Sequence, residues 1–541
     1  MIGTDYQQEL LKKLGELSPI YIVGGAVRDA QLGIPSQDVD AVMALPLQEI
    51  EKKLSDWGYK PHLIGARQQT VSLFRGTERM DISSFSGEVE TNALCRDFTL
   101  NAIYHDVRTD EIIDPLSGLQ DLREKRLKAC GCAADRFKED PLRILRLIRL
   151  AIRYDFSIEP ETWQAAVEHV QLLREVAAER VTEEFGRILI LDQIDKALGL
   201  LDDLGYFQTY IPELARLKGL VQNRYHTKDA WEHTRLVVKN TAPRILLRLA
   251  ALFHDLGKWE TASRECNVWG TIRLTDQGYE VNGYKLEGKN LERWANKEAE
   301  VHGGRLDNYP KTIIVKRIKP ARATQRKHLE VVPDGKRHFL QHERESARLV
   351  KEILPRFRWS MVLPGGRLGE RELEYIIGHH MLGTLTFMSE LKGEMDLTKF
   401  RHKTRRFAWE IGWNGQVYDK QRIENLLDLW RADFLGGKQD AAENMTRLDG
   451  IQGEIRKASA FLEERASLLD WTQFEEFAHG KGLEGERFGR FKEQVRHQVI
   501  LDAKYRLSDP QFLEREYGFF WKPGSVTSAA KRISRPREFF D

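Results

Sequence analysis

Short apolar runs alternate with polar, turn-forming stretches over the first 125 residues. Four of these runs predict strands, at residues 20–23, 38–43, 70–74 and 79–85. Helical spacing of apolar residues predicts a helix at 6–17 and another from about Arg96. This part of the chain is therefore expected to contain a small mixed sheet with helices.

Helical periodicity dominates from about residue 140 onward. Amphipathic helices are predicted at 140–154 and at 179–191, with two more within 229–256. Residues 259–337 are richer in Gly, Asn and Lys and contain β-like runs such as TIIVKRI, which indicates an insertion. Helical signal returns from about 339 to 510. The predicted fold class is α+β, with a small mixed-sheet head followed by largely α-helical domains.

Composition narrows the class of protein. The 541 residues include 84 Lys and Arg against 82 Asp and Glu, a net charge of +2, and 41% of the residues are hydrophobic. This balance excludes a highly charged disordered chain and a globally basic nucleic-acid binder. The sequence contains no 18-residue apolar run and no secretory signal, and its four cysteines form no CxxC pair. We expect free thiols in a cytoplasmic protein.

Two carboxylates on one predicted strand are the first candidate site. Asp38 and Asp40 are two positions apart, so they point to the same face of a strand. Two adjacent carboxylates repel each other, and divalent cations relieve that repulsion. Such a pair suits a two-metal site for phosphoryl or nucleotidyl transfer. Asp81 on a neighbouring predicted strand is either a third carboxylate of this site or a surface residue.

A glycine turn precedes these carboxylates. Gly24 and Gly25 follow the first predicted strand in the run GGAVRD, and glycines there allow backbone amides to approach a phosphate chain. Arg28 adds a guanidinium that matches phosphate geometry. Together, GGAVRD and the downstream DVD are far more specific than either motif alone.

These residues resemble the signature of the tRNA nucleotidyltransferase/bacterial poly(A) polymerase family, class II of the polymerase β superfamily. Four further segments resemble its motifs in the family's order, namely CRDFTLNA at 95–102, DPLSGLQDL at 114–122, EDPLRILRLIR at 139–149 and ERVTEE at 179–184. Cys95 stands where the family has an arginine.

The resemblance implies a role for each matching residue. Asp38 and Asp40 would be catalytic and would bind Mg²⁺. Asp140 and Arg143 would read the base edge, because they offer an acceptor and a donor that match cytosine and adenine, and we expect them to share a helix face. The other implied nucleotide-binding residues are Gly24, Gly25, Arg28, Asp29, Arg96, Asp97, Asn101, Arg146 and Arg149.

A second constellation combines histidines and aspartates. His254 and Asp255 stand in an HDLGK run, and His233 precedes them. Imidazole and carboxylate together suit a divalent transition metal. The pattern resembles an HD-type metal-dependent phosphohydrolase domain, which implies Asp433 as the fourth ligand and His342 and His380 as candidates for a second metal site or for phosphate binding. The metal and the hydrolysed substrate stay open.

The resemblance predicts four domains and one main activity. The domains are a nucleotidyltransferase head at 1–125, a nucleotide-selecting and neck region at 126–222, an HD-type domain at 223–445 with an insertion at about 259–337, and a helical tail at 446–541. The activity is addition of CMP, and of AMP in a full CCA-adder, to the 3′ end of tRNA from CTP and ATP. The segment Ser86–Leu94 is short for a CCA-adder, which favours a CC-only product.

Three alternatives stay open. The chain is a poly(A) polymerase of the same family, an HD phosphohydrolase whose N-terminal domain only binds RNA, or a non-catalytic RNA-binding protein. Two basic stretches, Lys311–His328 and the tail after Trp521, are candidate RNA contacts or ordinary solvated surface. Oligomeric state is not predicted.

Overall fold

The fold was examined in a computed structural model of the chain. It describes residues 2–64, 70–222, 228–269, 272–275, 278–281, 312–319, 330–332, 337–339, 341–393, 397–413, 418–437, 442–467 and scattered positions between 476 and 488. The tail after Trp521 and the helical signal predicted toward 510 lie outside the described residues. So do the side chains of the basic stretch Lys311–His328.

A seven-stranded mixed sheet forms the head, in the order β3-β4-β5-β2-β1-β6-β7. Its strands are β1 (Ile20–Val23), β2 (Asp38–Met43), β3 (His62–Ile64), β4 (Thr70–Arg75), β5 (Glu78–Ser84), β6 (Tyr104–Asp106) and β7 (Ile112–Ile113). Its helical segments are α1 (Asp5–Gly15), α2 (Gly25–Gln31), α3 (Leu47–Asp56), α4 (Val89–Leu94), the 3₁₀ turn η1 (Thr99–Asn101) and α5 (Gly118–Arg123). The pair β2–β5 is parallel, whereas β1–β2 and β1–β6 are antiparallel. The mixed-sheet head is confirmed.

The helix predicted from Arg96 is wrong. Helix α4 ends before this residue, and Phe98 is extended and bridges to Ala129. The amide of Thr99 then donates to the carbonyl of Lys128. These long-range backbone hydrogen bonds hold Phe98 extended, and the short η1 turn begins at Thr99.

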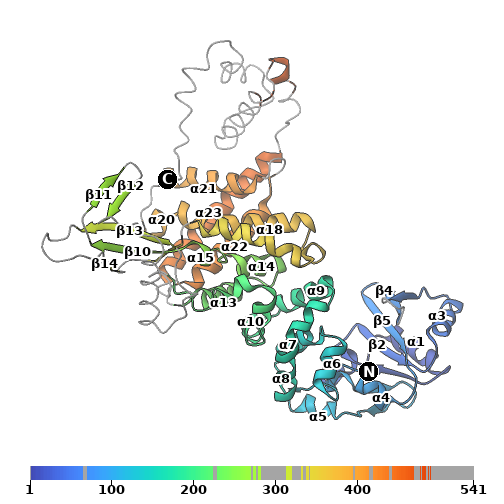
Figure 1. The fold of residues 1–541 in the computed structure, drawn as a ribbon. Helices are drawn as coiled ribbons and strands as arrows, with labels where there is room; N and C mark the ends of the chain where they lie inside the picture. The colour runs from blue at the N-terminus through green and yellow to red at the C-terminus, as the bar shows by residue number, and fades with distance from the viewer. Residues whose placement is uncertain are drawn as a thin grey trace.

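A helical neck follows the head and lies between it and the remaining helices in Figure 1. Its elements are β8 (Arg126–Leu127), α6 (Ala133–Glu139), α7 (Arg143–Tyr154), β9 (Ser157–Ile158), α8 (Pro160–His169), η2 (Val170–Glu175), α9 (Ala178–Leu189), α10 (Ile194–Asp203), α11 (Tyr206–Tyr210) and α12 (Pro212–Ala215). Helix α7 buries seven apolar residues on one face, as its amphipathic pattern predicts.

The helix predicted at 140–154 is broken at its start. Asp140 has φ −144° and ψ 96° and ends α6, while α7 begins at Arg143. Pro141 explains the break, because a proline disfavours helical backbone in the residue before it. Asp140 and Arg143 therefore do not share a helix face, although they lie on either side of one turn.

A second helical region holds α13 (Ala230–Asn240), α14 (Ile245–Phe253), α15 (Lys258–Thr261), α17 (His342–Ile353), η4 (Leu354–Arg356), η5 (Trp359–Met361), α18 (Arg367–His379), α19 (Leu382–Thr386), α20 (Met388–Leu391), α21 (Leu397–Gly412), α22 (Lys420–Gly436) and α23 (Ala442–Ser467). Buried Arg248 on α14 donates to the carbonyls of Leu189 and Leu191, which joins this region to the end of α9. Within the described part of the chain, no helix combines the length and apolar character needed to cross a membrane.

The insertion leaves the helical region between α15 and α17. Its described strands are β10 (Ala262–Trp269), β11 (Ile272–Thr275), β12 (Gly278–Val281), β13 (Thr312–Lys319), β14 (Glu330–Val332) and β15 (Arg337–Phe339). The predicted β-like run is thus confirmed as β13. Strands β10 and β15 pair with Ala262 opposite Phe339, so the two ends of the insertion meet where α15 ends and α17 begins.

Candidate functional sites

The β2 carboxylates lie on one face at the centre of the head sheet. Asp38 and Asp40 have exposed side chains, and Val39 between them is buried. Asp81 on β5 is the register partner of Asp40, so three carboxylates gather on adjacent strands. Desolvation by the surrounding head, followed by the negative charge of Asp81, raises the pKa of Asp40. A divalent cation would relieve this repulsion.

The glycine turn lies directly beside Asp40. Gly24 adopts φ +80°, a conformation that favours glycine, and α2 begins at the next residue. A Cβ on Gly24 would lie 3.5 Å from Asp40 Oδ2 and 3.8 Å from a terminal nitrogen of Arg96. The predicted residues Gly24, Asp40 and Arg96 are therefore brought together at the end of β1.

Arg28 is buried in a polar network behind this turn. Its Nε donates to Asp29 Oδ1 at 2.8 Å, and its terminal nitrogens donate to Asn101 Oδ1 and to the hydroxyl of Tyr154, each at 2.6 Å. The side chains of Asp29 and Asn101 are thus committed to Arg28. Tyr154 is not among the residues that the sequence predicts, since a tyrosine at the end of an amphipathic helix carries no signal of its own.

Asp97 is a second buried residue that joins helix α7 to the head. Arg146 on α7 donates to its Oδ2 from two nitrogens, at 2.9 and 2.7 Å, and Asn101 donates to its Oδ1 at 3.0 Å. Burial alone would raise the pKa of Asp97, but Arg146 and the hydrogen bonds outweigh burial and lower it. This carboxylate therefore stays charged and holds α7 against the head.

The predicted base-reading residues lie at the junction of α6 and α7. Arg143 donates to Glu139 at 3.1 Å and to the carbonyl of Cys95 at 2.8 Å. Asp140 accepts from Arg180 on α9 at 2.9 Å. The two residues are adjacent, because the amide of Arg143 donates to the carbonyl of Asp140.

Arg149 points away from this group. Its guanidinium is paired with the buried carboxylate of Glu184 on α9. Burial lowers the pKa of Arg149, and Glu184 only partly compensates. Arg149 thus joins α7 to α9 within the neck, and its contact with a nucleotide stays a prediction.

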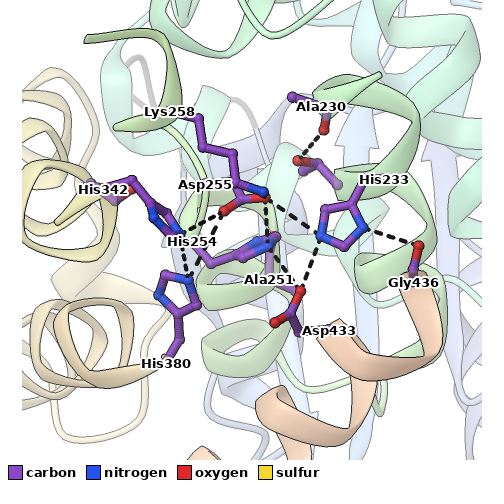
Figure 2. Close-up of polar contacts among 12 residues, drawn as sticks. Ala230, His233, Ala251, His254, Asp255, Lys258, His342, His380, Asp433 and Gly436 are labelled. Carbon is purple, nitrogen blue, oxygen red and sulfur yellow. Dashed lines mark hydrogen bonds and ion pairs between the residues drawn. The ribbon is translucent and has the colours of Figure 1, made fainter. Parts of the chain in front are cut away.

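The histidines and aspartates of the second constellation converge in the helical region (Figure 2). They come from three helices and from the residues that directly follow two other helices. The set is His233 on α13, His254 and Asp255 after α14, His342 on α17, His380 after α18 and Asp433 on α22. All are buried except Asp433, whose side chain is 18% exposed.

Asp255 lies between two groups of ligand atoms. Its Oδ2 is 3.5 Å from His233 Nε2 and 3.1 Å from His254 Nε2. Its Oδ1 is 3.2 Å from His342 Nε2 and 4.0 Å from His380 Nε2. Asp433 Oδ1 is 3.0 Å from His233 Nε2 and completes the first group. One carboxylate thus offers one oxygen to each of two candidate metal positions.

Backbone carbonyls orient all four histidines. In each ring the Nδ1 atom lies 2.7–3.0 Å from a carbonyl oxygen, which leaves Nε2 directed at the cluster. The accepting carbonyls belong to Gly436, Ala251, Phe339 and Ile377. Metal-binding histidines in proteins are held in this way, because the second hydrogen bond fixes the tautomer.

The electrostatics of the cluster fit a bound cation. Burial lowers the pKa of His254, but Asp255 and Asp433 outweigh burial and raise this pKa to about 10. Burial and the neighbouring imidazoles of His342 and His254 lower the pKa of His380 to about 3. His254 Nε2 and Asp255 Oδ2 face each other at 3.1 Å, and the ammonium of Lys258 pairs with the same oxygen. A divalent cation among these imidazoles and carboxylates would be bound by ligand types that suit it.

Lys258 lies at the edge of this cluster. Its ammonium is 2.6 Å from Asp255 Oδ2 and donates to Gln222 Oε1 at 2.6 Å. The ring of Phe339, at the root of the insertion, lies 5.7 Å from it. The insertion therefore changes the sequence spacing of the HD-type motif without separating its ligands, because both of its ends are held at this cluster.

Comparisons with known proteins agree with the geometry of the head. Residues 20–128 match the family model described as "Poly A polymerase head domain", and residues 155–218 match "Probable RNA and SrmB- binding site of polymerase A". The fold also resembles a solved CCA-adding enzyme in complex with ATP, with 18% identity and a TM-score of 0.51 over 94% of each chain. At this identity the likeness shows the fold alone.

Curated relatives match part of the chain. The "Multifunctional CCA protein" of Azoarcus sp. (strain BH72) is 36% identical over 262 residues, which is 44% of this chain and 62% of the relative. The "CCA-adding enzyme" of Streptococcus suis (strain 05ZYH33) is 36% identical over 209 residues, 36% of this chain and 51% of the relative. The chain thus spans between half and two thirds of these relatives.

The family likeness inferred from GGAVRD, DVD and the later motifs is therefore confirmed for the part of the chain that these comparisons cover. Residues 20–128 match the poly A polymerase head-domain family, and the chain is similar to curated CCA-adding enzymes over part of its length.

Proposed function

We propose that this chain adds nucleotides to the 3′ end of tRNA from CTP and ATP without a template. The observation that carries this proposal is the position of Asp38 and Asp40 on one exposed face of β2, beside the Gly24 turn. Paired carboxylates next to a phosphate-binding turn suit nucleotidyl transfer. The identities of the curated relatives support the same activity.

Each group of the head then has one task. Asp38 and Asp40 would hold Mg²⁺, which activates the attacking 3′ oxygen and neutralises charge on the leaving pyrophosphate. Asp81, opposite Asp40, adds negative charge that favours cation binding. Gly25 and Arg28 bind the triphosphate, with the Arg28 guanidinium 3.4 Å from the position of a Cβ on Gly25.

Base selection falls to the junction of α6 and α7. Asp140 accepts a hydrogen bond from the exocyclic amine of cytosine or adenine, and Arg143 donates to the neighbouring ring nitrogen. Arg180 holds the carboxylate of Asp140 from α9. For Arg143 to reach a base, its hydrogen bonds to Glu139 and Cys95 must give way.

The segment Ser86–Leu94 supports a CC-only product. Most of it forms α4, and the carbonyl of its last residue accepts a hydrogen bond from Arg136. The carbonyl of Cys95, directly after the segment, accepts from Arg143. A short segment fixed in this way lacks the freedom that a site needs to switch from cytosine to adenine.

The test supplies a tRNA lacking its last three nucleotides with CTP, with ATP and with both, and resolves products at single-nucleotide length. Addition that stops after two cytosines with both nucleotides present supports a CC-adder. Completion to CCA would overturn the CC-only proposal and keep the main activity. Long adenine tracts on unstructured RNA would favour a poly(A) polymerase instead.

The histidine–aspartate cluster supports a second function, metal-dependent hydrolysis of phosphate esters at RNA ends or on nucleotides. Two candidate metal positions share Asp255, and four imidazoles face them. His233, His254, Asp255 and Asp433 would hold one divalent transition metal, and His342 and His380 a second. Bound metal supplies a nucleophilic hydroxide at neutral pH.

A direct assay separates the two functions. The chain is loaded with Mn²⁺, Ni²⁺ or Zn²⁺ and incubated with RNA ending in a 3′ phosphate or a 2′,3′-cyclic phosphate, and phosphate release is measured. Release that Asp255→Ala abolishes and Asp38→Ala leaves intact supports the hydrolase. A chain that hydrolyses these ends but never extends tRNA would favour the alternative in which the head only binds RNA.

A further inference from the structure

Two residues of helix α7 that lie about two turns apart form hydrogen bonds with buried side chains of the head. Arg146 reaches Asp97, and Tyr154, eight positions later, reaches Arg28 and Asp29. The last residue of α7 is therefore tied to the helix that carries the phosphate-binding turn.

These two contacts are the ends of one chain of hydrogen bonds, and helix α7, which carries both ends, closes this chain into a ring. Arg146 donates to Asp97, and Asp97 accepts from Asn101 at 3.0 Å. Asn101 in turn accepts from Arg28, and Arg28 donates to the hydroxyl of Tyr154, both at 2.6 Å. The ring begins and ends on α7, whose first residue is Arg143. It therefore fixes the position of Arg28 relative to this helix.

The hydroxyl of Tyr154 both accepts and donates a hydrogen bond. It accepts from Arg28 and donates to Asp29 Oδ1 at 2.8 Å, and its aromatic ring lies 4.5 Å from the guanidinium carbon of Arg28. Arg28 and Asp29 are only 6% and 7% exposed. Hydrogen bonds to charged and buried groups of this kind are stronger than neutral ones.

We propose that Tyr154 is a positioning residue for the nucleotide triphosphate. It fixes the guanidinium of Arg28 beside Gly25 and couples this phosphate-binding position to the base-selecting helix α7. The nitrogen of Arg28 that faces Asn101 keeps a second hydrogen, which is available to a phosphate oxygen. This inference rests on the proposed nucleotidyl transfer.

The test is Tyr154→Phe, which removes the hydroxyl and keeps the ring. We expect the Kd for CTP and the inhibition constant of inorganic triphosphate to rise together by about tenfold, because one hydrogen bond to a charged group is lost. Binding of tRNA should not change. The matched control is Tyr210→Phe, since the hydroxyl of Tyr210 in α11 is buried without a hydrogen-bond partner.

A double variant tests whether Tyr154 acts through Arg28. Tyr154→Phe should add no further loss in an Arg28→Lys background, because the two effects share one interaction. Unchanged CTP affinity in Tyr154→Phe overturns the proposal, and so does weaker CTP binding with unchanged inorganic triphosphate binding. A wild-type chain that binds no CTP would overturn the proposed function as well, so the two failures are distinguishable.

Discussion

The head and the histidine–aspartate cluster place carboxylates in opposite surroundings. In the head, Asp38 and Asp40 are exposed on a strand, and their neighbours are a glycine turn and arginines. In the cluster, Asp255 is 1% exposed and lies among four imidazoles and a lysine. The first site is open to a large substrate, whereas the second is closed around its own ligands.

The two surroundings favour two kinds of cation, one that arrives with the substrate and one that stays bound to the protein. Exposed carboxylate oxygens are hard ligands that suit Mg²⁺, which keeps its waters and arrives with the phosphates of a nucleotide. Buried imidazoles whose other nitrogens are fixed by backbone carbonyls suit a transition metal that stays in place. In the proposed function, the same residue type, aspartate, would thus support two kinds of metal chemistry in one chain.

The largest expected effect is on the head. We expect Asp40→Asn to lower the rate of nucleotide addition by about a thousandfold, because the loss of one carboxylate removes charge that holds Mg²⁺. The metal content of the purified chain should not change. Single-turnover extension of tRNA measures the rate, and Asp110→Asn, in an exposed turn of the head, is the matched control. A rate within tenfold of wild type would contradict a metal role for Asp40.

The second largest expected effect is on metal binding by the histidine–aspartate cluster. We expect Asp255→Asn to weaken transition-metal binding by at least about a hundredfold, since both candidate positions share this carboxylate. Nucleotide addition with Mg²⁺ should stay at the wild-type rate. Elemental analysis after dialysis measures the metal, with exposed Asp203→Asn as the control. Metal retained at the wild-type level would show that the cluster is not a metal site.

A third test uses the close backbone contact between Gly257 and α17 beside the histidine–aspartate cluster. A Cβ on Gly257 would lie 2.3 Å from the carbonyl oxygen of His342 and 2.7 Å from the amide of Ser346. We therefore expect Gly257→Ala to force α15 and α17 apart and to lower the free energy of unfolding by about 3 kcal/mol. Metal affinity should fall with it, while CTP binding by the head is kept. The control is Gly450→Ala on α23, where a Cβ would lie in open space. Gly205 is unsuitable as a control, because its positive φ would strain an alanine.

The smallest expected effect is a pH dependence within the head. The pKa of Asp97 is lowered in the folded chain, so its charge stabilises the fold above its unfolded value of about 3.9. This contribution is lost as the pH falls through the folded pKa. Asp97→Asn should lower stability by about 1–2 kcal/mol at pH 7.

The difference between Asp97→Asn and wild type should then shrink below about pH 4. Denaturant unfolding of both proteins at a series of pH values measures it. A difference that stays constant down to pH 3 would show that the Asp97 charge is not what stabilises the fold.

Local patterns predicted much of the head. The four predicted strands are present within one or two residues, and the i, i+2 spacing placed Asp38 and Asp40 on one face. The adjacent His254 and Asp255, together with their motif, indicated the cluster and the distant Asp433, which the structure brings within 3.0 Å of His233. These predictions succeed because strand alternation and motif spacing are properties of neighbouring residues.

Predictions that depended on longer contacts were less accurate. The helix expected from Arg96 does not form, because Phe98 and Thr99 hydrogen-bond to a segment some thirty residues later. The pairing of Arg149 with Glu184 through the packing of α7 against α9 was likewise not predicted. No local pattern contains this information, since the partner belongs to another element.

The sequence by itself thus determined the α+β class, the face of the β2 carboxylates and the residue types of both sites. Only the tertiary structure decided that His342 and His380 join Asp255, that the ends of the insertion meet beside them, and that Tyr154 closes a ring with Arg28. The physical reason is that side-chain periodicity reports which way a residue points, whereas the partner that it meets is set by how whole elements pack.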